Sequence, residues 1–177
     1  NERVPTGLYG PSGFTLTSDS ISQSIRTGIE LFASFKINDQ IQLINNSSYN
    51  HSQITQEDDL KFTPVLTPQF IINQEIIYRH TQNLSFGLSM RYQDKAYLNF
   101  ENNKSLNQYT VFNGRINYKL EKFDVSIIVN NMTDNYYFNN GSIIDSRDVE
   151  NGELINRERM YFVAPPRNYH IAIKYIF

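Results

Sequence analysis

One stretch of the sequence combines the residue types that could hold a polar ligand carrying rings and negative charge. Three aromatic side chains stand together, and three arginines follow them along the chain. The six candidate ligand-binding residues are Tyr136, Tyr137, Phe138, Arg147, Arg157 and Arg159. A tyrosine can stack on a ring and donate a hydrogen bond, and an arginine can clamp a carboxylate or an anionic chelate. The alternative interpretation is an aromatic girdle beside an ordinary loop.

The sequence offers no catalytic constellation, and neither an enzyme activity nor a cofactor is predicted. The chain has no Cys, which removes thiolate nucleophiles, disulfides and Cys-ligated metals together. His51, His80 and His170 lie far apart in the sequence, so each is interpreted as a polar wall or girdle residue and no metal site is predicted. The net charge of -2 gives no electrostatic footprint for nucleic acid.

The elements that must position these residues are strands, and the clearest is at the end of the chain. Five apolar or aromatic residues alternate there with small or polar ones. They are Tyr169, Ile171, Ile173, Tyr175 and Phe177. A period of two indicates a strand with two unlike faces, which an outer-membrane barrel shows to lipid and a soluble sandwich shows to its core. We expect these five side chains to face lipid.

The same alternation predicts about seven strands in all. They cover residues 25–37, 40–51, 68–78, 84–93, 112–120, 123–130 and 169–177, while residues 1–20 are interpreted as a loop. The polar faces of these strands carry charges that are costly to bury without partners. A lumen or a plug would remove this cost, so six residues are predicted to face one of them: Arg26, Glu30, Glu75, Arg91, Arg115 and Lys119.

The connections favour a barrel over a soluble sandwich. Short turns at 38–39, 80–83 and 121–122 alternate with long polar segments at 52–67, 99–107 and 133–159, the last predicted to be irregular. Outer-membrane barrels have short periplasmic turns and long extracellular loops, whereas sandwiches have Greek-key crossovers. The mean hydropathy of -0.48 fits this fold, because half of each barrel strand is polar. The predicted fold class is therefore all-β, an antiparallel transmembrane β-barrel segment.

Three motifs resemble those of TonB-dependent outer-membrane receptors. The residues Asn131-Met-Thr-Asp-Asn-Tyr-Tyr137 resemble the motif that ends the penultimate strand of that family, with Met132 where Leu is usual. The ending Ala164-Pro-Pro-Arg167 and the strand after it resemble the last strand of the family, with Pro166 where Gly is usual. Ser24-Ile-Arg-Thr-Gly-Ile-Glu30 is similar to a pattern that opens a strand in such barrels.

The resemblance implies a barrel of about 22 strands around a folded plug. About seven strands alone would leave two open edges, which hydrocarbon does not tolerate. Residues 1–177 are therefore predicted to be the C-terminal portion of such a barrel. The plug and the earlier strands would come from a longer precursor or a second chain.

The function that the resemblance implies is energy-dependent import of a scarce nutrient through the cell outer membrane. The expected ligand is a ferric siderophore or haem. The expected partners are the TonB complex, the remainder of the barrel and plug, and outer-membrane lipid. The long loops would be extracellular and the C-terminus periplasmic. Two alternatives stay open: a related importer of glycans or peptides, and a passive pore or structural barrel.

Overall fold

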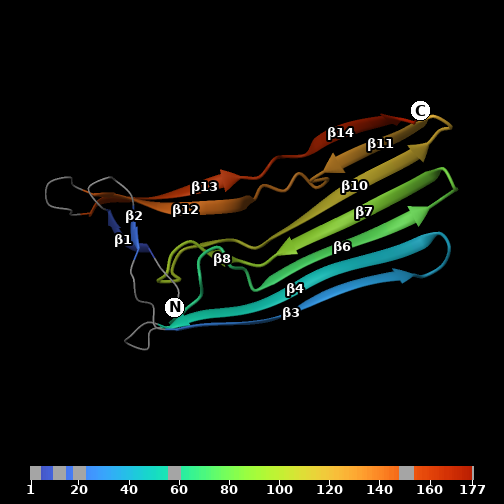
Figure 1. Cartoon of the computed structure of the whole chain (residues 1–177). Coiled ribbons are helices and arrows are strands. Elements are labelled where there is room, and N and C mark those ends of the chain that lie inside the picture. The colour runs from blue at the N-terminus through green and yellow to red at the C-terminus, as the bar shows by residue number, and fades with distance from the viewer. Residues whose placement is uncertain (1–4, 10–14, 18–22, 56–60, 148–153, 177) are drawn as a thin grey trace.

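The protein is an open antiparallel sheet in a single layer (Figure 1). Its computed structural model describes residues 5–9, 15–17, 23–55, 61–147 and 154–176. Seven long strands form a meander in which each strand pairs with its neighbours along the path β14-β11-β10-β7-β6-β4-β3. They are β3 (Gln23–Lys36), β4 (Ile41–Thr55), β6 (Phe70–Arg79), β7 (Leu84–Gln93), β10 (Tyr109–Lys119), β11 (Phe123–Asn130) and β14 (Asn168–Tyr175). The all-β fold and these seven strands confirm the prediction from the alternation.

The pairing register gives the sheet one apolar and one polar face. Leu43 of β4 lies opposite Ile76 of β6, which lies opposite Leu88 of β7. Farther along the sheet, Ile127 lies opposite Ile171. This apolar face runs over all seven strands, and its larger members include Leu31, Phe35, Leu43, Tyr49, Ile72, Ile76, Tyr78, Phe86, Leu88, Ile116, Tyr118, Ile127, Tyr169, Ile171 and Ile173.

No strand or loop of the described chain forms a layer over the apolar face. Ile29 and Ile171 each expose 70% of their surface, and Leu88 on a central strand exposes 46%. Soluble proteins seldom expose a contiguous apolar patch of more than a few hundred Å². A sheet with this face needs an apolar surrounding, as lipid around a barrel would provide.

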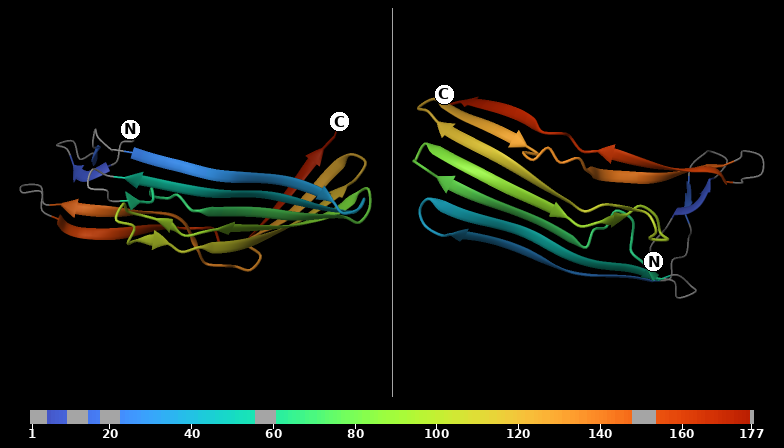
Figure 2. Two further views of the ribbon diagram at one scale, coloured as in Figure 1. Left: turned by 90° about the horizontal axis from the view of Figure 1, so that it is seen from below. Right: turned by 180° about the vertical axis from the view of Figure 1, so that it is seen from behind.

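The two ends of the sheet differ in the length of their connections (Figures 1 and 2). Three short turns join β3 to β4, β6 to β7, and β10 to β11 at the end where β14 finishes. The first is tightened by Asn38, whose Oδ1 accepts hydrogen bonds from the backbone N–H groups of Gln40 (2.9 Å) and Ile41 (2.8 Å). The predicted alternation of short turns and long connections is confirmed.

The long connections lie at the opposite end and contain short strands of their own. Strand β5 (Lys61–Phe62) pairs with β4, and β8 (Ala96–Tyr97) pairs with β9 (Ser105–Leu106). Buried apolar side chains gather at this end, among them Ile54, Phe62, Leu98, Leu106 and Val111. The buried apolar side chains of the described residues thus form a small packed core beneath the long connections.

Two predicted irregular segments contain strands. Residues 133–159 were predicted to be irregular, but β12 (Phe138–Arg147) and β13 (Leu154–Val163) form an antiparallel hairpin there. The alternation is hidden by a register shift between Phe138 and Asn140 and by polar residues on both faces. Residues 1–20 were predicted to be a loop, but β1 (Pro5–Tyr9) pairs with β2 (Thr15–Thr17). These two strands are short and irregular in register, so no period of two is visible.

No helix among the described residues is long and apolar enough to cross a membrane.

Candidate functional site

The six charged residues predicted to share a polar face do share it. Each projects to the side opposite the apolar face, because it occupies the alternate positions of its strand. In the register, Arg26 lies opposite Ser52, Glu30 opposite Ser48, Glu75 opposite Ser89, Arg91 opposite Asn73, Arg115 opposite Gly87 and Lys119 opposite Asp124. That the polar face borders a lumen or a plug stays a prediction.

Two of these charges neutralise each other across a glycine. Arg115 Nη2 lies 2.7 Å from Glu75 Oε1, and the pair spans β7 at Gly87. A Cβ at Gly87 would come within 3.1 Å of Glu75 Oε1 and 3.6 Å of Arg115 Nε, so glycine leaves the space that the pair occupies. Arg115 Nε is buried and has no hydrogen-bond partner among the described residues. This pair therefore contributes little net charge to the polar face.

Arg91 has a different surrounding, which we call the Arg91 cluster: Asn73, Arg91, Gln93, Tyr109 and Tyr137. The guanidinium of Arg91 donates to Asn73 Oδ1 (3.0 Å) and to Gln93 Oε1 (3.0 Å). The hydroxyl of Tyr109 donates to the same Gln93 oxygen at 3.0 Å. Both partners of Arg91 are neutral carboxamides, and no carboxylate of the described chain forms an ion pair with it. Its positive charge is therefore available to an anion.

Tyr137 extends this cluster toward the long connections. Its ring lies 4.3 Å from the ring of buried Tyr109, measured between centroids. Burial raises the pKa of the Tyr137 phenol, the neighbouring Tyr109 raises it further, and Arg91 lowers it. The net shift is upward, so the phenol stays protonated at neutral pH and can donate a hydrogen bond.

The other predicted ligand-binding residues make contacts different from those of Tyr137. Tyr136 is 71% exposed and its ring meets Phe138 edge-on at 5.3 Å, while Phe138 stacks on Tyr161 at 4.7 Å. Arg159 is exposed on the β12–β13 hairpin, where it lies opposite Ile143. It is about 13 Å along β13 from Val163, the residue that pairs with Phe138 beside Tyr137. The side chains of Arg147 and Arg157 lie outside the described residues. The role of all six candidate residues in ligand binding stays a prediction.

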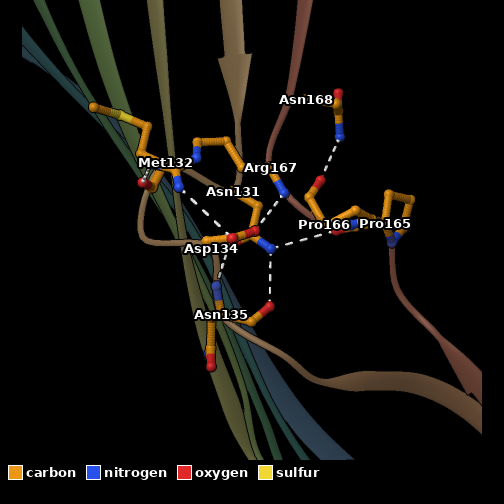
Figure 3. A network of polar contacts seen from close by, with 8 residues as sticks. All are labelled: Asn131, Met132, Asp134, Asn135, Pro165, Pro166, Arg167 and Asn168. Atoms are coloured by element: carbon orange, nitrogen blue, oxygen red, sulfur yellow. Dashed lines mark hydrogen bonds and ion pairs between the residues drawn. The ribbon is translucent and has the colours of Figure 1, made fainter.

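The motif after β11 forms a clamp on the chain that enters β14 (Figure 3). Asn131 is 2% exposed and has a φ of 51°. Its Nδ2 donates to the backbone oxygens of Asn135 (2.9 Å) and Pro165 (3.3 Å), and its Oδ1 accepts from Asn135 N (2.9 Å). Its own backbone N–H donates to Asn113 Oδ1 at 2.9 Å. The backbone N–H and the side chain of this one buried asparagine thus connect β10, the segment after β11 and the segment that enters β14.

A second set of bonds closes the clamp. Asp134, with a φ of 53°, accepts a hydrogen bond at Oδ1 from Arg167 N (2.8 Å), and its Oδ2 lies 3.6 Å from Arg167 Nη2. Arg167 Nη1 also donates to Met132 O at 3.4 Å. The side chain of Met132 lies over Gly114, where a Cβ would meet its sulfur at 2.9 Å. Two of the three motifs that carry the resemblance, the one that starts at Asn131 and the one that starts at Ala164, therefore contact each other.

The C-terminal strand places four of its five predicted lipid-facing residues on the apolar face. Tyr169, Ile171, Ile173 and Tyr175 pair with Val129, Ile127, Val125 and Phe123 of β11. All four are exposed, between 43% and 70%. Phe177 lies outside the described residues. Contact of these residues with lipid stays a prediction.

Sequence reasoning missed three members of the Arg91 cluster: Asn73, Gln93 and Tyr109. Alternation alone puts each on a polar face, but only the register shows that Tyr109 lies opposite Gln93, and Arg91 opposite Asn73. Among the described residues, no three His, Asp or Glu side chains come together as metal ligands would.

The fold matches part of the solved structures of several siderophore receptors. Over 98% of this chain it matches the siderophore receptor PiuA from Acinetobacter baumannii, with a TM-score of 0.70 and 18% identity. It matches the ferric yersiniabactin uptake receptor FyuA from Yersinia pestis over 91% of its length, with a TM-score of 0.70 and 18% identity. The closed form of the ferric-catecholate import receptor Fiu from E. coli K12 matches over 96%, with a TM-score of 0.65 and 18% identity.

The chain spans about a quarter of the receptors it matches: 24% of PiuA, 26% of FyuA and 23% of Fiu. No protein-family model matches the sequence, and no curated protein matches it by sequence. What is shared is the architecture of part of a receptor barrel.

Proposed function

We propose that this chain is the C-terminal portion of a TonB-dependent outer-membrane receptor that imports a ferric chelate. The observation that carries the proposal is the fold match over nearly the whole chain to siderophore receptors. The uncovered apolar face supports a place in the outer membrane, because lipid would cover it. The remaining strands, the plug and the TonB-contacting segment would belong to the rest of the receptor.

The Arg91 cluster supports an anionic ligand. Its guanidinium is held in place by Asn73 and Gln93 but is not neutralised by them. Tyr137 adds a protonated hydroxyl and, with Tyr109, a pair of rings at the end of the sheet that carries the long connections. A carboxylate or catecholate chelate would offer oxygens to Arg91 and flat groups to the tyrosines.

A neutral ligand is the second candidate, and the other polar groups of this face favour it. Asn117 accepts from Ser126 Oγ at 2.8 Å, and Asn113 Nδ2 lies 3.5 Å from Ser89 Oγ. Carboxamides and hydroxyls of this kind also bind the hydroxyls of a glycan. The proposal of a glycan importer rests on these residues.

Growth of a deletion strain distinguishes the two. Under iron limitation, the strain is supplied with ferric citrate, a ferric catecholate, a ferric hydroxamate or haem as the only iron source, and separately with oligosaccharides as the only carbon source. We expect the strain to grow poorly on one iron source. Supplying the intact receptor should restore growth on that source, and inactivating the TonB complex should abolish growth on it again. Normal growth on every iron source with a defect on a glycan would reject iron import.

Binding by the purified intact receptor tests the site. Arg91→Ala should weaken binding of that iron source about 10- to 100-fold, because a hydrogen bond to a charged group contributes about 1.5–3 kcal/mol. Lys119→Ala is the matched control, since it removes a cation from the same face at the short-turn end. Equal affinities for the two variants would remove the Arg91 cluster from the site while leaving the class of function intact.

A further inference from the structure

The apolar face is interrupted at one place on β4 and β6. Asn45 of β4 lies opposite Gln74 of β6 on that face. Ser47 is the next residue of β4 on the same face. Ser47 Oγ donates to Asn45 Oδ1 at 2.8 Å, and Asn45 Nδ2 donates to Leu31 O at 3.2 Å. Gln74 is exposed, and its carboxamide has no hydrogen bond to any described residue. We call these three residues, Asn45, Ser47 and Gln74, the polar patch.

The polar patch lies at mid-height of the apolar band. Gln74 is at the midpoint of its strand between Phe70 and Tyr78, about 13 Å from each. Phe70 packs against Tyr49 at 4.9 Å, and Tyr78 stacks on Phe86 at 6.3 Å, so aromatic pairs mark both ends of the band. The apolar band of an outer-membrane barrel is about 25 Å tall. Gln74 therefore projects at the level of the hydrocarbon centre.

The rest of the face shows that this position is exceptional. The residues that continue the row beyond Gln74 are Met90 and Phe112. On β11 and β14 the outward positions are all apolar or aromatic. Hydrocarbon offers no hydrogen-bond partner, so an exposed carboxamide there loses the partners it has in water. A partner other than lipid would remove this cost.

We propose that the polar patch is the contact between two copies of the receptor, related by a twofold axis that passes beside Gln74. This inference rests on the proposed place of the chain in the outer membrane. A carboxamide both donates and accepts, so the patch is complementary to itself, as a twofold contact requires. The outward positions of β4 and β6 carry no charge that would repel a second copy. Ala33, beside Asn45, and Ser47 are small, and small side chains let membrane segments approach closely.

Cysteine crosslinking in the intact receptor tests the contact, because this chain contributes no Cys of its own. A Gln74→Cys receptor, oxidised in the outer membrane, should give a species of twice the receptor mass. Ile127→Cys on β11 is the matched control on the same face and should give none. A crosslink from both positions, from neither, or from Gln74→Cys to another protein would overturn the proposal.

A second variant does not depend on the introduced thiol. Asn45→Leu with Gln74→Leu makes the patch apolar and should convert the receptor, extracted in mild detergent, from dimer to monomer. A dimer that persists would overturn the proposal. Import of the iron source and recovery of each variant in the outer-membrane fraction are measured in the same strains. A receptor that reaches the membrane and imports normally but does not crosslink refutes only the twofold contact, whereas absence of the wild type from that fraction refutes the proposed function.

Discussion

Replacing Asn131 tests whether the clamp holds the last two strands together. Asn131→Ala removes three side-chain hydrogen bonds, two to Asn135 and one to Pro165. At about 0.5–1.5 kcal/mol each, their loss costs about 2–4 kcal/mol. The φ of 51° at this position adds about 1 kcal/mol for alanine, since residues other than Gly and Asn avoid the left-handed region. We therefore expect a loss of about 3–5 kcal/mol.

Two further variants separate these contributions. Asn131→Gly loses the same hydrogen bonds, but glycine adopts a positive φ without strain. It should therefore be less destabilising than Asn131→Ala by the backbone strain of about 1 kcal/mol. Asn130→Ala is the control: it is a neighbouring asparagine that donates one hydrogen bond, to Asn168 Oδ1 at 2.9 Å. It should cost about 1 kcal/mol.

The measurement is denaturant unfolding of the intact receptor in lipid vesicles, followed by the different electrophoretic mobilities of folded and unfolded barrel. The free energies of unfolding should fall in the order wild type, Asn130→Ala, Asn131→Gly, Asn131→Ala. If Asn131→Ala is no less stable than Asn130→Ala, the clamp does not hold the strands. If Gly and Ala at position 131 are equal, the left-handed backbone contributes nothing.

Three other predictions concern the two faces of the sheet and the ligand. Ile171→Lys should destabilise the folded receptor by about 2–4 kcal/mol and so reduce its recovery in the outer membrane, whereas Ala172→Lys on the polar face should be much milder; equal losses would show that the faces are assigned wrongly. Gly87→Val should displace Glu75 from Arg115 and lower the unfolding midpoint, and an unchanged midpoint would show that the pair has room to move. Tyr137→Phe should weaken ligand binding up to about 10-fold, because it removes the hydroxyl that donates a hydrogen bond. Since the pKa of Tyr137 is raised, the affinity difference between wild type and Tyr137→Phe should persist between about pH 6 and 9. A difference that disappears within that range would contradict a protonated phenol.

The sequence predicts the seven-stranded meander because a period of two survives wherever one strand face is apolar. It fails where neither face has a consistent environment. On β12 the Asn-Asn-Gly run at 139–141 has the composition of a turn, yet it forms a bulged strand whose Gly141 lies against Leu98 and Leu106. A long-range contact of this kind is invisible to local alternation.

The candidate site was predictable in its parts but not in its assembly. Arg91 and Tyr137 were both singled out, the first as a wall residue and the second as a ligand-binding residue. They belong to one cluster because Tyr109 contacts the Tyr137 ring and shares Gln93 with Arg91, in a register of β7 and β10 that no local pattern specifies. Arg159, nearer to Tyr137 in the sequence, is carried away from it along the hairpin.

The clamp also explains what the family resemblance can and cannot indicate. Asn131, Asp134 and Arg167 belong to two of the three motifs that carry the resemblance, and their side chains bond to one another's segments. In this chain these bonds join the segment after β11 to the segment that enters β14. They are bonds within the sheet, and the solved siderophore receptors match this fold at 18% identity. If the chain belongs to the proposed ferric-chelate receptor, we expect ligand selectivity to lie in residues outside the clamp, and Arg91, whose charge no described carboxylate neutralises, is the first position to test.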